Sequence, residues 1–206
     1  MLQANIISNI QKTLRSSVAS SGGSGGGEPP FIPINLIGVS EQFDNAAWSK
    51  VRATVTANTA NAPTGALTAD KLIATSVATD HKISKAVAGC TASVAYTFSV
   101  YLKQAGLQWV ALYNAVGKGQ YFDLQNGTVG GVFIGAPSDA TIADAGGGWW
   151  RCSITATSAT TTLTHVIFLA NGATGYSFTG DDIAGVYAWG AQLEIGSTVN
   201  TYIPAP

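Results

Sequence analysis

Residues 96–103 read YTFSVYLK, with an apolar side chain at every second position, and this alternation predicts a β-strand with one buried face. The alternation recurs in residues 51–56, 150–155 and 187–195. Residues 165–170 form a nearly continuous apolar run, as in a strand buried on both faces. Asn126-Gly127 is typical of a type I′ turn between two strands. About nine to eleven short strands and no convincing helix follow residue 34, which predicts an all-β, jelly-roll-like β-sandwich of two packed sheets.

The alternation also assigns side chains to the core. In each segment the residues at every second position share a face, and the apolar set is expected to point inward. These sets are Val51, Ala53 and Val55; Tyr96, Phe98, Val100 and Leu102; Trp150, Cys152 and Ile154; and Tyr187, Trp189, Leu193 and Ile195. Because Trp150 is assigned to the core, its neighbour Trp149 is expected to face outward or into a subunit interface.

The N-terminal residues follow a different pattern. An apolar stripe with a period of four predicts an anchor helix in residues 1–20, formed by Leu2, Ile6, Ile10, Leu14 and Val18. Such a helix is marginal alone in water, so its stripe needs a partner. Residues 21–34 follow as a flexible Gly/Ser/Pro linker, and residues 35–206 form the β-sandwich domain. The stripe is expected to pack either on its own domain or on another protein. The linker favours packing on another protein, because a helix docked on its own domain needs no tether.

Charged residues are scarce. The chain has 10 Lys and Arg and 11 Asp and Glu among 206 residues, and these make up 10% of it, against about 25% in a typical soluble domain. Nucleic acid is not an expected partner, since phosphate neutralisation needs clustered cations. Nor is a membrane, since no apolar run approaches the roughly 20 residues that span a bilayer. The low charge indicates a multimer or a particle-bound protein, although an ordinary Thr-rich β-sandwich has the same composition.

Catalytic chemistry finds little support. His165 lies in the apolar run, where a hydrogen-bonded structural role is favoured, and His81 lies in an expected loop. No nucleophile motif accompanies them, and the acids are too scattered for a pair of catalytic carboxylates. The adjacent Asp181 and Asp182 suit a Ca²⁺ loop or, more plainly, a solvated turn. We therefore predict no catalytic residue, no metal site and no cofactor.

Aromatic residues supply the candidate binding surface. Sugars are bound by flat aromatic faces flanked by hydrogen-bonding amides and carboxylates. Of the five tryptophans, two fall outside the expected core, and each has a neighbour that suits a binding surface. The resulting candidates for glycan binding or for a subunit interface are Trp109, Tyr113, Trp149 and Arg151. For Arg151 a structural ion pair with Glu194 or Asp44 is the plainer interpretation.

Several motifs together show a family resemblance. In chain order they are Asn35–Ile37, Ser40–Lys50 (SEQFDNAAWSK), Ala62–Gly65, Ala69–Leu72, residues 96–103, Gly148–Ser153 (GWWRCS), Trp189–Ser197 (WGAQLEIGS) and Thr201–Pro204. Their order over residues 35–204 resembles the carbohydrate-binding-module-like jelly-roll domain of bacteriophage structural proteins, including head fibres, head spikes and tail fibres.

The resemblance implies a virion component rather than an enzyme: a head decoration or fibre protein, made in the host cytoplasm and displayed on the virion surface. It implies a homotrimer, with residues 1–20 as the anchor that binds capsid or tail proteins. The alternative that stays open is a receptor-binding tail-fibre or tail-spike module that recognises a host surface polysaccharide.

Overall fold

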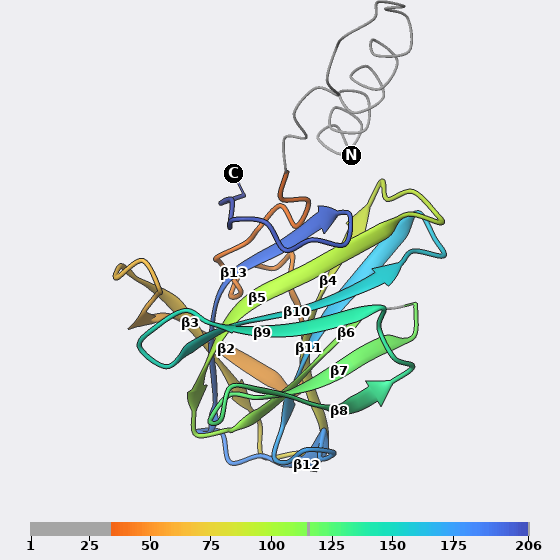
Figure 1. Cartoon of the computed structure of the whole chain (residues 1–206). Helices are drawn as coiled ribbons and strands as arrows, with labels where there is room; N and C mark the ends of the chain where they lie inside the picture. The colour runs from red at the N-terminus through yellow and green to blue at the C-terminus, as the bar shows by residue number, and fades with distance from the viewer. Residues whose placement is uncertain (1–33, 115, 206) are drawn as a thin grey trace, which may run out of the picture.

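The computed structural model describes residues 34–114 and 116–205, which form a body of β-strands and loops (Figure 1). The anchor helix predicted in residues 1–20 lies outside the described residues. The strands are β1 (Ser49–Val51), β2 (Ala53–Asn61), β3 (Leu67–Ala74), β4 (Ala78–Ala88), β5 (Ala95–Ala105), β6 (Trp109–Asn114), β7 (Lys118–Asp123), β8 (Thr128–Ile134), β9 (Asp139–Asp144), β10 (Trp149–Thr157), β11 (Thr162–Ala170), β12 (Ser177–Thr179) and β13 (Gly185–Ile195). The described part contains no helix that could cross a bilayer.

The strands pair antiparallel into two sheets that pack face to face (Figure 1). The first sheet has the order β1-β4-β11-β6-β7-β8, with β12 also paired to β4, and the second has the order β2-β3-β13-β5-β10-β9. Eight strands form nested pairs: β3 with β13, β4 with β11, β5 with β10 and β6 with β7. The first of these strands along the chain thus pairs with the last. This nesting is the jelly-roll arrangement, and the predicted all-β sandwich is confirmed.

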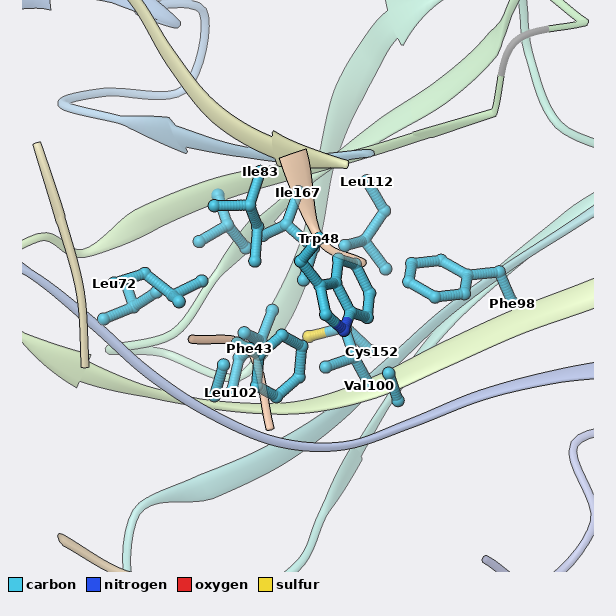
Figure 2. Close-up of a cluster of buried hydrophobic side chains, with 14 of the residues drawn as sticks. Phe43, Trp48, Leu72, Ile83, Phe98, Val100, Leu102, Leu112, Cys152 and Ile167 are labelled. Carbon is cyan, nitrogen blue, oxygen red and sulfur yellow. The ribbon is translucent and has the colours of Figure 1, made fainter. Parts of the chain in front are cut away.

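The core lies between the sheets, where the alternation of β5 and β10 predicted it. The second sheet contributes Phe98, Val100, Leu102, Cys152 and Ile154, and the first contributes Ile83, Leu112 and Ile167. The loop before β1 adds Phe43 and Trp48, whose ring centroids lie 4.9 Å apart inside the cluster (Figure 2). The Trp48 Nε1 group donates to the carbonyl of Val39 at 2.9 Å, so the indole is buried with its polar atom satisfied.

Strand β13 departs from the predicted alternation. Leu193 faces the core, whereas Trp189 belongs to a separate buried cluster on the outer side of the second sheet. The register of β13 against β5 shifts between Trp189 and Gln192, and Gly190 in this interval has a φ of 61°. The β-bulge adds one residue and so reverses the side to which later residues point. The prediction of one shared face is therefore wrong for the set Tyr187, Trp189, Leu193 and Ile195.

The hairpin between β7 and β8 lies where Asn126-Gly127 predicted a turn, but its geometry differs. A type I′ turn needs positive φ at both central residues, and here only Gly127, with a φ of 64°, has one. The loop instead wraps around the Asp123 carboxylate, which accepts from the backbone N–H groups of Gln125 and Asn126 at 2.9 and 3.1 Å. The position of the turn is confirmed and its type is wrong.

Both histidines lie in strands and are buried, His81 in β4 and His165 in β11. The loop predicted for His81 is wrong: its Nδ1 lies 2.6 Å from the carbonyl oxygen of Arg52, and its Nε2 lies 2.9 Å from that of Phe178. His165 stacks on Phe98 with 4.7 Å between ring centroids. Neither ring nitrogen of His165 has a hydrogen-bond partner among the described residues, contrary to the predicted role. Burial lowers the pKa of His165 to about 3.

Replacing His165 with leucine should make the protein less sensitive to acid. The ring has a pKa of about 3 when folded and about 6.5 when unfolded. Between these values the unfolded state binds more protons, so stability falls as the pH drops. From pH 7.5 to 4.5 we expect the wild type to lose about 2–3 kcal/mol more than His165→Leu. Urea unfolding at both pH values measures the difference, and equal losses in the two proteins would contradict this role of His165.

Candidate functional site

The outer face of the first sheet carries a cluster of aromatic side chains. Along β6, Trp109 and Tyr113 flank Ala111 on this face. The cross-strand partners of Ala111 are Phe168 on β11 and Tyr121 on β7. A small residue is thus surrounded by bulky rings. We call the whole set the aromatic face; its members are Trp109, Tyr113, Tyr121, Phe133, Phe168 and Tyr176.

Phe133 makes the most ring contacts within the aromatic face. Its ring centroid lies 5.0 Å from that of Phe168 and 5.0 Å from that of Tyr176. The Tyr121 centroid is 5.3 Å away, in an edge-on geometry that aromatic pairs favour. Gly119 on β7 provides the space, because a Cβ there would lie 2.8 Å from Phe133 Cδ1. Although it belongs to the edge strand β8, Phe133 therefore reaches back over the sheet and holds the rings together.

The rings of the aromatic face differ in exposure. Tyr121 and Phe168 are buried, Trp109 and Tyr113 are half-buried, and Tyr176 is 41% exposed. The half-buried rings are held in place by the sheet beneath them, while part of their surface stays open to solvent. Such rings can pack against a flat apolar ligand surface without first losing much conformational freedom.

One cation lies over the aromatic face. The Lys82 Nζ is 5.1 Å from the Phe168 ring centroid, a cation–π distance. It also forms a 2.8 Å ion pair with Asp80, which pairs with Arg52 as well. Partial burial alone would raise the pKa of Asp80, but hydrogen bonds from Lys82 and Arg52 outweigh it and hold the pKa at about 2. Asp80 therefore stays ionised at neutral pH and is already engaged by the two cations.

Polar groups border the aromatic face beside Trp109. The cross-strand partner of Trp109 is Asp123, whose carboxylate oxygens accept from Gln108 Nε2 at 2.9 Å and from Asn126 Nδ2 at 2.8 Å. Burial alone would raise the pKa of Asp123, but these donors lower it. The carboxylate thus orders the loop and its amides. Among the described residues no group of three or more His, Cys, Asp and Glu side chains could hold a metal ion.

The structure separates the candidate residues into two places. Trp109 and Tyr113 lie together on the aromatic face, whereas Trp149 and Arg151 lie on the outer side of the second sheet. Trp149 is only 3% exposed, and its Nε1 donates to the carbonyl of Asn61 at 3.1 Å. It points away from the core, as predicted. Its own chain covers it, however, so the predicted exposed or interface position is wrong.

Arg151 is tied to the C-terminal segment rather than to an acid. Its guanidinium donates to the carbonyl of Asn200 at 2.6 Å and to the hydroxyl of Ser99 at 3.0 Å. In the described part of the chain it forms no ion pair, so the predicted pairing with Glu194 or Asp44 is wrong. Glu194 instead accepts from the side-chain amide of Asn200 at 2.6 Å. Arg151 is therefore a structural residue of the second sheet.

The adjacent acids Asp181 and Asp182 form a turn. Asp181 Oδ1 accepts from the backbone N–H groups of Ile183 and Ala184 at 2.9 and 2.6 Å. The carboxylate of Asp182 accepts from the backbone of Ser76 at 3.2 Å. Of the two sequence interpretations, the solvated turn describes this loop: the Asp181 carboxylate orders the backbone of its own turn, and the Asp182 carboxylate ties the turn to the loop between β3 and β4.

Comparisons with known proteins give fold likenesses alone. No family model and no curated protein matches the chain. The enzymatically active domain of bacteriophage CBA120 tailspike protein 4 is similar over 79% of this chain and 21% of that one, at 13% identity and a TM-score of 0.47. TmCBM61, in complex with β-1,4-galactotriose, is similar over 78% of this chain and 97% of its own, at 11% identity and a TM-score of 0.44. The CBM22-1 xylan-binding domain from Paenibacillus barcinonensis Xyn10C is similar over 82% of this chain and 95% of its own, at 13% identity and a TM-score of 0.40. With TM-scores below 0.5, these likenesses assign no function to this chain.

Trp149→Ala should destabilise the protein much more than Trp109→Ala. Truncating the buried, hydrogen-bonded Trp149 leaves a cavity and an unpaired carbonyl, at an expected cost of about 3–5 kcal/mol. Trp109 is half-buried, and its truncation should cost about 1–2 kcal/mol. Urea unfolding of both variants gives the two values. Equal losses of stability would contradict the difference in burial between Trp149 and Trp109.

Proposed function

We propose that the β-sandwich binds a host surface polysaccharide through the aromatic face, without chemical turnover. The observation that carries the proposal is the grouping of partly accessible rings over the first sheet: Trp109 and Tyr113 lie on β6, and Tyr176, in the loop before β12, packs against Phe133 and Phe168. The C–H faces of sugar rings pack on such aromatic surfaces, and the neighbouring amides supply hydrogen bonds. The carboxylates that border the face, Asp80 and Asp123, are already bound to cations and amides, which supports binding rather than acid–base catalysis.

The test is a glycan array followed by titration with the best ligand. Replacing Trp109 and Tyr176 together with alanine should weaken binding at least tenfold, because both stacking surfaces are lost. Leu67→Ala is the matched control, since Leu67 is 60% exposed but lies on the second sheet. It should bind like the wild type. A blank array with the folded wild-type protein, or equal binding by the double variant, refutes the proposal.

We also propose that the chain is a virion structural protein, a head decoration or fibre protein anchored by residues 1–20. The support is in the sequence: the period-four stripe, the linker of residues 21–34, the scarcity of charge and the resemblance of residues 35–204 to phage structural domains. The two roles are compatible, because an anchored and tethered body can display a binding face to the host. The homotrimer and the capsid or tail partner remain predictions of this proposal.

Deleting residues 1–20 should abolish attachment to virus particles while leaving the unfolding midpoint of the body unchanged. A finer test replaces Ile6 and Ile10 with aspartate, which puts two charges on the stripe. The matched control replaces Asn5 and Asn9 with aspartate, which adds the same charge off the stripe. Co-sedimentation with particles that lack the protein measures attachment. Attachment that survives the deletion refutes the anchor.

A further inference from the structure

Asp123 on β7 organises the polar groups at the Trp109 end of the aromatic face. It is the cross-strand partner of Trp109, so the two side chains lie next to each other on the outer side of the first sheet. Its Oδ2 atom accepts from Gln108 Nε2 at 2.9 Å and from Asn126 Nδ2 at 2.8 Å. Because one oxygen binds both nitrogens, the two side-chain amides are neighbours. We call them the amide pair; it borders Trp109, which directly follows Gln108 in the chain.

The Asp123 carboxylate determines which atom of each amide points away from it. Burial alone would raise the pKa of Asp123, but hydrogen bonds from the amide pair and from two backbone N–H groups lower it, so the carboxylate is ionised at neutral pH. An ionised carboxylate only accepts hydrogen bonds, so both amide nitrogens face it and both amide oxygens point elsewhere. Gln108 is half-buried and Asn126 is exposed, and no donor in the described part of the chain bonds to either amide oxygen. The amide pair therefore presents two free acceptors beside Trp109.

The Trp109 ring is held in place beside these acceptors. A Cβ at Gly130 on β8 would lie 2.7 Å from Trp109 Cζ3, which is closer than real contacts allow, so the ring occupies the space that a side chain would fill. A sugar ring that packs on Trp109 carries its hydroxyl groups around its rim. The amide oxygens can accept hydrogen bonds from hydroxyl groups in that position.

We propose that the amide pair selects a neutral sugar unit with free hydroxyl groups, by accepting hydrogen bonds from these hydroxyls while the sugar packs on Trp109. A hydroxyl donates a hydrogen bond, whereas a carboxylate or a methyl ether oxygen only accepts. Either of these groups at this position would meet two acceptors and the Asp123 charge with no donor to offer. The cations Lys82 and Arg52 do not compensate, because both are paired with Asp80. The selectivity rests on the proposed function and names the class of polysaccharide that it takes.

A glycan array tests the selectivity when it carries oligomers of glucose, galactose and mannose beside oligomers of galacturonate and mannuronate. We expect the wild type to bind at least one neutral oligomer, and to bind the acidic oligomers about tenfold more weakly or not at all. Acidic oligomers that bind as well as the neutral ones overturn the selectivity and leave the proposed function standing. An array that is blank for both classes refutes the proposed function, and the selectivity with it.

Gln108→Met tests the amide oxygen by titration with the neutral oligomer that binds best. Methionine has nearly the length of glutamine but no amide, so affinity should fall about fivefold or more while the stacking ring stays. O-Methylation of the oligomer should then weaken binding less in the variant than in the wild type, because one acceptor is already gone. Gln104→Met is the matched control, an exposed glutamine on β5 of the second sheet, and should bind like the wild type. Wild-type affinity in Gln108→Met, or an equal loss on methylation in both proteins, overturns the proposal.

Asp123→Asn tests the carboxylate as a positioning residue. The new side chain keeps the shape but adds a donor, so one neighbouring amide must turn its oxygen inward to accept from it. Affinity for the neutral oligomer should fall as in Gln108→Met, and the two substitutions together should cost less than their separate losses added. Urea unfolding checks that each variant is folded. Fully additive losses in folded variants would contradict the orientation of the amide by Asp123, and the Gln108→Met result still decides the role of its oxygen.

Discussion

A single buried side chain, that of Asn35, holds both ends of the described chain to the strand between them. Its amide nitrogen donates to the carbonyls of Ala191 and Ile203, both at 2.9 Å. Its oxygen accepts from the backbone N–H groups of Ile37 and Leu193 at 3.1 and 3.2 Å. An asparagine amide has two donors and two acceptor lone pairs, so all of them are used. Because each buried polar group left without a partner costs about 1–3 kcal/mol, the first segment, the bulged β13 and the C-terminal segment are fixed as a unit.

This clamp makes the two outer faces of the sandwich unequal. The C-terminal segment that Asn35 holds lies on the second sheet, where Ile203 N–H donates to Gln192 at 2.8 Å and the Tyr202 ring lies 4.6 Å from that of Trp189. The C-terminal segment therefore buries side chains, such as Trp189, that point outward from the second sheet. On the first sheet the aromatic face stays partly open. Both sheets have aromatic residues on their outer sides. Because the C-terminal segment covers those of the second sheet, only those of the first sheet are accessible to a ligand.

The alternation of apolar residues correctly predicted which side chains face the core in regular strands, as in residues 96–102 and 150–154. It failed in β13, because a bulge at Gly190 reverses the faces and apolar residues occur on both sides of it. For Trp149 the direction was correct, but its cover comes from residues distant in the chain. The candidate site shows the same limit. Trp109 and Tyr113 share a strand and were predicted together, whereas the other rings of the aromatic face depend on strand order, which alternation does not contain.

The aromatic face and the edge strand β8 depend on the same ring. Phe133 belongs to the edge strand, yet its ring packs among those of Tyr121 and Phe168 over the sheet, in the space that Gly119 leaves. This packing holds β8 where its hydrogen-bond register with β7 is interrupted. A ring that is held in this way loses little conformational freedom when a flat ligand packs on it. One aromatic anchor therefore keeps the edge strand β8 on the sheet and pre-organises the aromatic face.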